Sequence, residues 1–406
     1  MEYSTERITF NDKLGEFMLG EFVLNVDSLY AHLSKLTDQR DPRGVRYALV
    51  DALTLIILAK LSGEDEVHGM SEWLKLRTPQ LVSWLKLPRA TMPHEVTLSR
   101  IMGTAVEAEE LAAVLQKYFD GQAQMSQEVV IAIDGKTMRG TIPKGETQGV
   151  HLLAAYLPSE GLVLMQVEVE NKENEIVAAP KLLKQLDLRR KVVIGDAMHT
   201  QRQLSIRIVE AGGDYLWIAK DNQAELKADI EHLFAPQECP PATSPLPTDF
   251  QSITDSHYGH GRFETRTLTS SSMLRDFLDW PYLQQVFKLE YRAVDLETGQ
   301  VYADTHYGLT SLSAADASPD RLLALKRHYW GIENRLHYRR DVCLNEDRCR
   351  LRTGHAAHTM AIINNLVLAL IDRLDFKSIP DARRIFSAHP IQALNLFFQP
   401  PISTLQ

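Results

Sequence analysis

Hydrophobic positions recur with two different periods along this chain, and the change of period divides it. From about Val26 to Asp120, apolar residues fall at three- and four-residue steps, which predicts amphipathic helices. One of them, "RYALVDALTLIILAKLSG" (46–63), ends in glycine, a common helix stop. We therefore expect a helical N-terminal domain over 26–122, preceded by a polar leader at 1–25.

Short apolar runs bounded by turn residues take over from residue 123 and indicate strands. Three successive strands are followed by alternating helices and strands, a pattern that favours a mixed α/β sheet with parallel crossovers. We assign 123–234 to this sheet. The strands are predicted at 128–136, 151–158, 161–170, 191–198 and 214–220, and the helices at 174–188, 200–213 and 222–234.

A proline-rich stretch at 235–249 interrupts this alternation. Strand-like segments follow it, so we expect a β-rich insertion over 235–312. A helix with a long polar face is predicted from about Pro319 to Arg340. A strongly apolar helix at 355–374 and a weaker one near 380–397 complete the chain, and we assign 313–406 to the second part of the sheet domain, with the helix that carries Glu333, and to these C-terminal helices.

The composition, 44% apolar and 24% charged, excludes a disordered or fibrous protein. No apolar run approaches the ~20 residues of a membrane helix, and the start of the chain lacks the pattern of a secretory signal, so no membrane partner is expected. Three cysteines suit a reducing cytoplasm. The net charge of −9 argues weakly against nucleic acid as a partner, although local patches can differ.

Two strands end in a carboxylate. Asp134 ends "VVIAID" and Asp196 ends "KVVIGD". A charged group is costly to bury unless it is paired, hydrogen-bonded or metal-bound. If the two strands are neighbours, the two acids lie close together and favour a hard divalent cation such as Mg²⁺. Each aspartate alone could equally form a turn or cap a helix.

Glu333 is the best candidate for a third carboxylate. It lies on the predicted helix in "YWGIENRLHYRRD", where His337 and Arg340 share its face. Asp341, Glu346 and Asp347 are rival acids only a few residues away. A surface ion pair between Glu333 and Arg340 is the alternative interpretation.

The segment from Arg321 to Arg352 is locally basic, with more arginines and lysines than acids. Aromatic residues stand between the cations, an arrangement that suits stacking on nucleic-acid bases. A solvated helix face with a few core aromatics would give the same pattern. The cations are Arg321, Lys326, Arg327, Arg335, Arg339, Arg340, Arg348, Arg350 and Arg352, and the aromatics are Tyr329, Trp330 and Tyr338.

Five blocks of the chain together resemble the insertion-sequence DDE transposases, in the group that includes the H-repeat-associated proteins. The blocks are "IAIDGKTMRG", "GDAMHTQRQ", "GGDYLWIAKDNQAEL", "GHGRFETR" and "HYWGIENRLHYRRDVCLNEDRCRLRTG". The segments "DPRGVRYALVDALTLIILAKLSG" and "PHEVTLSRIM" resemble that group's helical associated domain. The resemblance covers roughly residues 30–375.

The resemblance implies an RNase H-like catalytic core with the catalytic, metal-binding triad Asp134, Asp196 and Glu333. Two Mg²⁺ ions, which Mn²⁺ can replace, would support cleavage of double-stranded DNA at the element's terminal repeats and joining of the freed 3′ end to target DNA. It also implies a homodimer on DNA, in the cytoplasm at the nucleoid. The N-terminal helices would read the element ends, and "MPHEVTLSRIM" is our choice for the reading helix.

Further site residues come from the same resemblance. Arg340 stands at the family's basic position seven residues after the glutamate, and Lys326 and Tyr329 stand where related transposases have a tyrosine and an arginine. We expect phosphate or DNA contacts from a set of basic side chains. We also expect support of the site from two residues at the start of a predicted helix. The first set is Lys136, Arg139, Arg335, His337, Arg339 and Arg340, and the second is Asn174 and Glu175, for which a helix-start role is the alternative.

Three other functions remain open. A domesticated, metal-dependent nuclease would cut DNA without strand transfer. A repressor-like protein would bind terminal repeats without cutting, its carboxylates being structural. A carboxylate-pair glycoside hydrolase would use two of the same acids, but the arginine-rich helix argues against a sugar substrate.

Overall fold

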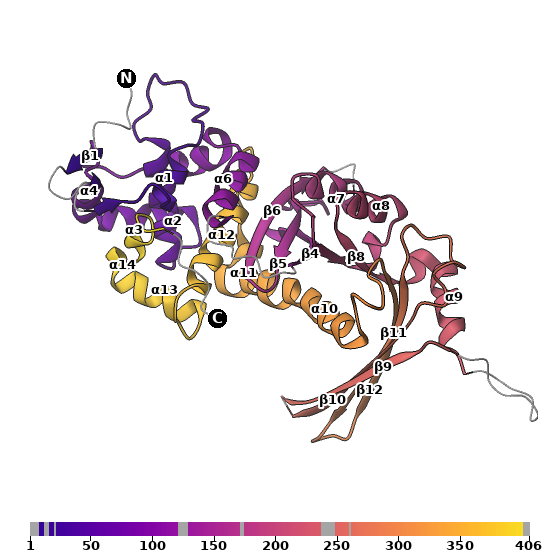
Figure 1. The fold of residues 1–406 in the computed structure, drawn as a ribbon. Helices are drawn as coiled ribbons and strands as arrows, with labels where there is room; N and C mark the ends of the chain where they lie inside the picture. The colour runs from indigo at the N-terminus through magenta and orange to yellow at the C-terminus, as the bar shows by residue number, and fades with distance from the viewer. Residues whose placement is uncertain are drawn as a thin grey trace, which may run out of the picture.

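The computed structural model describes residues 8–11, 16–19, 22–120, 129–170, 174–236, 248–259 and 261–400. They form a helical lobe and a lobe built on a large twisted sheet, joined side by side, with a long β-ribbon projecting from the far end (Figure 1). Most of the proline-rich segment expected at 235–249, and the domain boundary expected at 122/123, lie outside the described residues.

The helical lobe is organised around α2 (Leu49–Leu61), every residue of which is buried. Its continuous apolar sequence reflects this central position, because a helix that is apolar all round must be covered on all sides. The other helices of the lobe surround it. They are α1 (Leu29–Leu33), α3 (Val67–Leu76), α4 (Thr78–Leu85), α5 (Glu95–Arg100), the π-helical turn η1 (Ile101–Ala105) and α6 (Ala108–Asp120).

The C-terminal end of the chain returns to this lobe. Helices α13 (Ile379–Ala388) and α14 (Pro390–Asn395) pack against α2. The backbone N–H of Tyr30 donates to the carbonyl of Phe397 at 2.8 Å, which fastens α1 to the end of the chain. The C-terminal helices that we grouped with the second part of the core over 313–406 thus include two that pack on the helical lobe.

The leader expected at 1–25 contains regular structure where it is described. Three short strands, β1 (Ile8–Asn11), β2 (Glu16–Leu19) and β3 (Phe22–Leu24), form an antiparallel sheet of their own. Their shortness explains why the hydrophobic pattern did not predict them, because three or four residues give too few repeats of a two-residue period.

The large sheet has the strand order and directions of an RNase H-like core, as the sequence predicted. An antiparallel meander, β4 to β6, is extended by β7 and β8, which run parallel to β4. The first five residues of β4 are all buried, since a strand covered on both faces has no polar side. The strands are β4 (Val129–Thr137), β5 (His151–Leu157), β6 (Leu162–Val169), β7 (Lys191–Gly195) and β8 (Asp214–Ala219).

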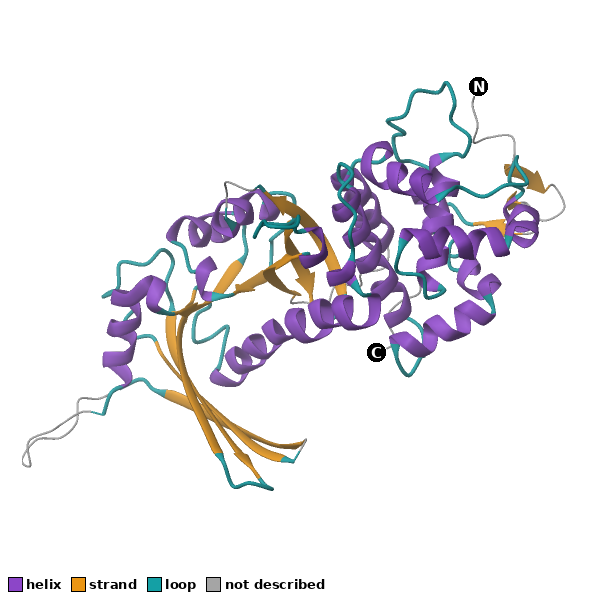
Figure 2. Ribbon diagram, turned by 180° about the vertical axis from the view of Figure 1, so that it is seen from behind, coloured by secondary structure: helices purple, strands orange, loops and turns teal. Residues whose placement is uncertain are grey.

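Helices cover both faces of this core. Helices α7 (Glu175–Leu183) and α8 (Arg202–Glu210) lie over one face, and α10 (Pro319–Gly331) crosses the other (Figure 2). The helix α10 continues through a π-helical segment, η5 (Ile332–His337), into α11 (Tyr338–Leu344). The helix predicted from about Pro319 to Arg340 is therefore confirmed. Helix α12 (Ala356–Asp372) then packs against both β6 and the helical lobe.

The β-rich insertion extends the core sheet and does not form a separate one. Strand β12 pairs antiparallel with β8, so the whole sheet runs β6-β5-β4-β7-β8-β12-β11-β10-β9. Arg266 lies over the rings of Tyr291 and Trp330, which joins the ribbon to α10. The strands are β9 (Gln251–Gly259), β10 (Arg262–Ser271), β11 (Gln285–Asp295) and β12 (Val301–Thr310), with α9 (Ala224–Phe234) packed against β8, β11 and β12.

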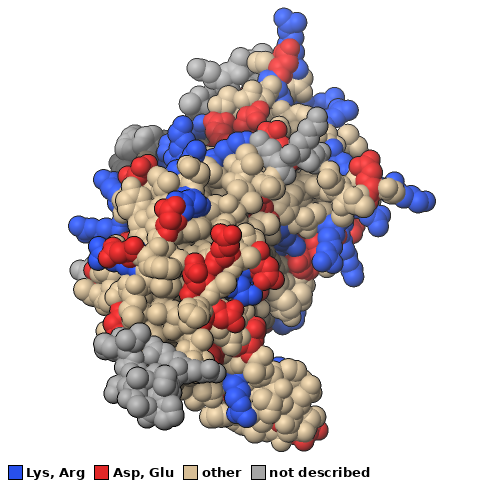
Figure 3. Space-filling view, turned by 90° about the vertical axis from the view of Figure 1, so that its right-hand side faces the viewer, with Lys and Arg blue, Asp and Glu red and all other residues tan. Residues whose placement is uncertain are grey.

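Charge is unevenly distributed over the surface. Viewed from the end that carries the ribbon, acidic side chains gather in the middle of the face, and lysines and arginines lie mainly toward its edges (Figure 3). Within the described ranges, none of the helices combines the length and apolar character of a bilayer-spanning segment.

Gly308 is required where the insertion joins the core. It pairs with Ile218 of β8, and a Cβ at this position would lie 2.4 Å from the carbonyl oxygen of Trp217 and 2.3 Å from the ring of Phe287. We expect Gly308→Ala to destabilise the protein by ~1–3 kcal/mol through overpacking. Ala303→Val, at an exposed position of the same strand, should change stability by less than ~0.5 kcal/mol. Urea unfolding of both variants measures the difference, and equal midpoints would contradict the prediction.

Candidate active site

The two aspartates lie side by side at one end of the sheet. Strands β4 and β7 are parallel, and Ile133 of β4 is paired with Gly195 of β7. Asp134 follows Ile133 and Asp196 follows Gly195, so the two carboxylates lie at neighbouring positions of adjacent strands. Asp134 is still within β4, whereas Asp196 is the first residue past β7 and precedes the short helix η3 (Ala197–His199).

The helix that carries Glu333 lies against Asp134. The Nε2 of His337 is 3.1 Å from one carboxylate oxygen of Asp134, and the hydroxyl of Tyr329 donates to the other at 3.5 Å. Glu333 is one turn after Tyr329 and one turn before His337, so it lies between two residues that both contact Asp134. Its side chain is exposed.

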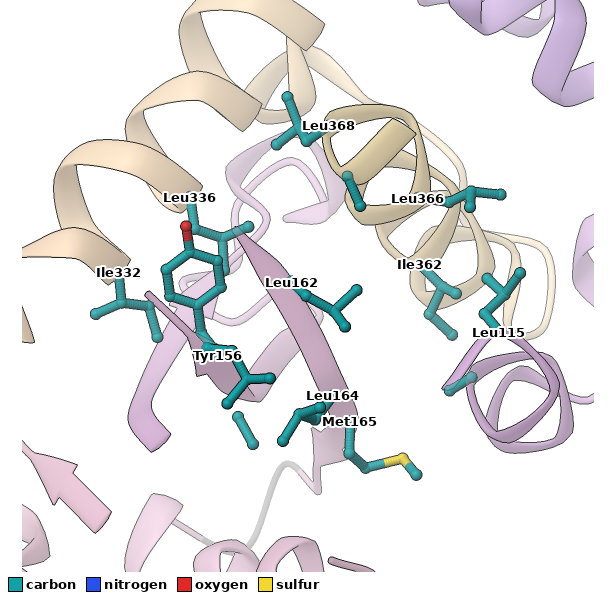
Figure 4. Close-up of a cluster of buried hydrophobic side chains, with 14 of the residues drawn as sticks. Leu115, Tyr156, Leu162, Leu164, Met165, Ile332, Leu336, Ile362, Leu366 and Leu368 are labelled. Carbon is teal, nitrogen blue, oxygen red and sulfur yellow. The ribbon is translucent and has the colours of Figure 1, made fainter. Parts of the chain in front are cut away.

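Apolar packing holds this helix in place on the sheet. Ile332 and Leu336, which flank Glu333, are buried and face Tyr156 of β5 (Figure 4). At Gly331 a Cβ would lie 3.2 Å from Pro158, so the helix passes close over the end of β5. Glu333 itself lies in the π-helical segment, a distortion often found at functional sites because it re-aims side chains without ending the helix.

Tyr329 lies among four carboxylates. Burial raises the pKa of its hydroxyl, and the negative charges of Asp134, Asp196, Glu333 and Glu175 raise it further. The three predicted triad residues therefore act electrostatically on one buried side chain, although they are separated by as much as 199 residues in sequence. The structure thus brings all three acids to one region.

Two lysines balance part of this negative charge. The Lys220 ammonium lies 3.2 Å from Asp196, and the pKa of Asp196 is below its ordinary value because the N–H of Ala197 and Lys220 outweigh the effect of burial. Lys326 lies over the ring of Tyr329, 4.7 Å from its centroid. Burial and the charge of Lys220 lower the pKa of Lys326 to about 8, against the opposing effect of Asp196 and Glu333.

Glu175 joins the segment that contains Asp134 to the segment that contains Asp196. It accepts a hydrogen bond from His151 of β5 at 2.9 Å, and Nε2 of His199 in η3 lies 3.2 Å from its other oxygen. Its carboxylate occupies the space over Gly135, where a Cβ would lie 2.2 Å from Oε1. Glu175 therefore contacts the residue after Asp134 and the helix after Asp196. Asn174 caps α7, its side chain accepting from the N–H of Val177.

The predicted basic residues separate into two groups. Lys136 is paired with Asp341 at 2.7 Å and lies 3.4 Å from Asp347, so it ties β4 to α11. Arg139 and Arg335 are exposed. Arg339 is paired with Asp372 of α12, and Arg340 is fully buried.

Arg340 is held inside the protein by two partners. Its Nε donates to Oε2 of the equally buried Glu346 at 2.7 Å, and Asn364 of α12 donates to the same oxygen at 2.8 Å. The phosphate contact expected from Arg340 does not agree with this position, because DNA cannot reach a side chain with no exposed surface. This ion pair also engages Glu346, one of the alternative candidates for the third carboxylate.

The acidic side chains fit a divalent ion by their chemistry, since carboxylate oxygens are the donors that Mg²⁺ and Mn²⁺ prefer. In this structure, Nε2 of His337 lies 3.1 Å from the carboxylate of Asp134, and Nζ of Lys220 lies 3.2 Å from that of Asp196. Among the described residues, no group of three or more His, Cys, Asp or Glu side chains is arranged as a ready metal cluster.

Several residues of the site were not identified from the sequence. His151 and His199 pair with Glu175, and Lys220 pairs with Asp196. The position of His199 three residues after Asp196 was the available signal. Nothing local shows that its partner lies on another helix.

An RNase H-like sheet with aspartates at adjacent strand ends and a glutamate on a later helix defines the DDE class of proteins. The family described as "Transposase DDE domain" matches residues 125–370, and the accompanying "DDE_Tnp_1-associated" domain matches 30–119. The chain belongs to this transposase family, as the sequence resemblance indicated.

Bacterial relatives are similar over most of the chain. YbfL and the H repeat-associated protein YhhI of Escherichia coli are each 28% identical over 356 residues, 86% of this chain and 91% of theirs. A protein of Xanthobacter autotrophicus is 30% identical over 276 residues, 66% of this chain and 88% of its own. Among solved structures, piggyBac transposase in a synaptic complex with hairpin DNA is distantly similar, with 9% identity and a TM-score of 0.40 over 90% of this chain and 78% of that one.

The burial of Arg340 predicts a structural role. Removing one partner of a buried ion pair leaves the other charge uncompensated, so Arg340→Ala should destabilise the protein by ~3–5 kcal/mol. Arg335→Ala, at an exposed position of the same helix, should change stability by less than ~0.5 kcal/mol. Chemical unfolding of the two variants makes the comparison. A stable Arg340→Ala protein would show that the pair with Glu346 contributes little.

Glu175 predicts a distinct response to acid. Burial raises its pKa, but hydrogen bonds and charges from His151 and His199 outweigh this and lower the pKa to about 2. The stability contributed by a carboxylate with a lowered pKa is complete above its unfolded value of ~4.3 and is lost as the pH falls toward 2. Glu175→Gln should remove this part of the pH dependence, as measured by urea midpoints from pH ~5 to ~2. Glu225→Gln on the exposed side of α9 is the control, and its profile should match that of the wild type.

Proposed function

We propose that this protein is a DNA transposase that cuts at the ends of an insertion sequence and joins the freed 3′ ends to target DNA. Family membership supports a transposase. The observation that carries the catalytic assignment is the contact of Asp134, within β4, with the helix that carries Glu333, beside Asp196, which directly follows the adjacent strand β7.

Asp134, Asp196 and Glu333 would hold divalent metal ions, Mg²⁺ or Mn²⁺. When bound, a pair of such ions activates water or a 3′-hydroxyl and stabilises the leaving oxygen of the phosphodiester. The carboxylate chemistry and the transposase family support this assignment. The exposure of Glu333 and the half-exposed side chain of Asp196 leave these oxygens accessible to a substrate as large as DNA.

The surrounding residues orient these carboxylates and compensate part of their negative charge. His337 and Tyr329 orient Asp134 through one bond to each oxygen. Lys220 and Lys326 offset the repulsion among the acids, which would otherwise favour a protonated carboxylate. Glu175, paired with His151 and His199, keeps the two strand ends at a constant separation.

The basic residues take different roles in this proposal. Arg139 and Arg335 are exposed near the site and are assigned to phosphate contacts. Lys136, Arg339 and Arg340 are assigned to fixing the Glu333-bearing helix, because each is mostly buried and engaged by an acid of the protein, whereas Arg139 stays 80% exposed beside Asp347.

The substrate would be double-stranded DNA, both as terminal repeats and as target. The helical lobe would recognise the element ends, and pairing of two ends would require a homodimer on DNA. The relatives are bacterial, so we place this activity at the nucleoid of a bacterial cytoplasm. The segment "MPHEVTLSRIM" (92–102) contains all of α5 and the start of η1, and it stays our choice for the reading element.

A cleavage assay tests the triad. A labelled duplex carrying the flanking element end is incubated with Mg²⁺ or Mn²⁺ and with wild type, Asp134→Asn, Asp196→Asn or Glu333→Gln. Each variant should bind DNA but lose activity by more than the ~10–100-fold that replacement of a residue behind a metal ligand costs. Asp320→Asn, at an exposed position of α10 away from the site, is the matched control and should cut normally.

Each other outcome selects a different function. Cutting without joining, when target DNA is added, would favour a nuclease. Tight binding with no cutting by the wild type would favour a terminal-repeat-binding protein. Normal cutting by Glu333→Gln would remove Glu333 from the triad and turn attention to Asp341 and Asp347.

A further inference from the structure

An arginine-rich strap connects the two lobes beside the candidate active site. We define the strap as residues 348–354, with the sequence "RCRLRTG". It follows the short helix η6 (Glu346–Arg348) and leads into α12, which runs along the helical lobe. The cleavage mechanism above uses none of its residues.

The strap has one apolar side and one charged side. Cys349 and Leu351 are partly buried against a small core of Met138, Leu152, Ala357 and Ala361. The alternate residues Arg348, Arg350 and Arg352 are exposed. A two-residue alternation in an extended segment directs successive side chains to opposite sides, so packing of the apolar side forces the arginines outward.

Backbone contacts hold the strap to the sheet lobe. Arg352 donates to the carbonyls of Thr141 and Ile142, at 3.2 and 3.0 Å. At Gly140 a Cβ would lie 2.4 Å from the carbonyl oxygen of Cys349, so the two backbones touch. These contacts are made to η2 (Arg139–Thr141) and the residue after it, and η2 begins two residues after the end of β4, the strand that contains Asp134.

The other end of the strap is held equally closely to the helical lobe. The N–H of His355 donates to the carbonyl of Gly103 in η1 at 3.1 Å. A Cβ at Gly103 would lie 2.2 Å from the carbonyl oxygen of Thr353, and a Cβ at Gly354 would lie 2.1 Å from that of Gly103. The strap is therefore fixed at both ends, and its arginines are carried on an ordered backbone.

Two of these arginines have no partner among the residues that the structure describes. Neither Arg348 nor Arg350 forms an ion pair or side-chain hydrogen bond with any residue in the described part of the chain. Acids toward the two ends of the strap act on other residues. Asp347 is engaged by Lys136 and Arg139, and Glu109 and Glu168 act on His355 and His358. In a chain with a net charge of −9, two uncompensated guanidinium groups on a fixed segment are a local positive surface.

We propose that the strap is a phosphate-contact surface for duplex DNA that extends from the candidate active site toward the helical lobe. The inference rests on the proposed function, since it assumes DNA as the substrate. Arginine suits this role because its planar fork donates two parallel hydrogen bonds to a phosphate. Contacts to the phosphate backbone position the duplex without reading its sequence, and Arg139, which is 80% exposed, continues the surface on the sheet side.

The salt dependence of DNA binding tests the proposal in the full-length chain. The double variant Arg348→Gln/Arg350→Gln removes two contacts, so the slope of log affinity against log salt should become shallower by about 1.8, roughly 0.9 for each phosphate contact. Raising the salt concentration from about 50 to 200 mM should therefore reduce the ratio of wild-type to variant DNA affinity roughly tenfold. Fluorescence anisotropy with a labelled element-end duplex and a labelled unrelated duplex gives both slopes, without divalent ions.

A matched variant controls for the loss of two positive charges. Arg190→Gln/Arg207→Gln changes two exposed arginines at the other end of the sheet domain, where β7 begins, and it should leave the slope unchanged. Thermal unfolding should show that both double variants are as stable as the wild type, since the replaced side chains are exposed.

Several results would overturn the proposal. An unchanged slope for the strap variant, with binding intact, would remove the strap from the DNA path and leave the cleavage test unaffected. An equal change in the control would reveal a general charge effect. A loss confined to the element-end duplex would indicate base reading in place of phosphate contact. A wild type that binds neither duplex would overturn this proposal and the proposed function together.

Discussion

The contact between β4 and the helix that carries Glu333 is the interaction on which the candidate site depends. Asp134 and Glu333 are separated by 199 residues in sequence, and no local structure relates them. Three kinds of contact bring them together: polar contacts of Tyr329 and His337 with Asp134, the ion pair of Lys136 with Asp341, and apolar packing beneath the helix. Loss of any one would leave the aspartates in place and move the glutamate.

Buried ionic groups fasten the same helix to the rest of the protein. At its end, Lys60 of α2 donates to the carbonyl of Leu344 and to Asp65, which is also paired with Arg383 of α13. Burial lowers the pKa of Lys60, and Asp65 opposes this. Such groups are expensive to desolvate but hold a defined geometry once all are paired. They connect the helical lobe directly to the helix that carries Glu333, so the two lobes position the site jointly.

In the proposed function, this acidic protein meets DNA through local surfaces. The glycines at positions 103, 140 and 354 allow backbones of both lobes to approach the strap closely. The ribbon of β9–β12 lengthens the sheet on the opposite side of the active site. The strap and the ribbon therefore extend the surface around Asp134, Asp196 and Glu333, although the net charge of the protein is negative.

The sequence by itself determined the strands of the large sheet and their alternation with helices, because apolar periodicity is a local property: the run Val129–Ile133 is apolar wherever its partners lie. It determined the transposase family, and through it the RNase H-like class, by the resemblance of several motifs to that family. The sequence also proposed Asp134, Asp196 and Glu333 as a set, through resemblance to a family.

Only the tertiary structure decided what each charged side chain contacts. Arg340 and Arg335 look alike in the sequence, yet one is buried against Glu346 and the other is exposed. Likewise, the insertion could have formed its own sheet until β12 was seen to pair with β8. Ion pairs and sheet edges join residues far apart in the chain, and their energies depend on burial, which a local pattern does not specify.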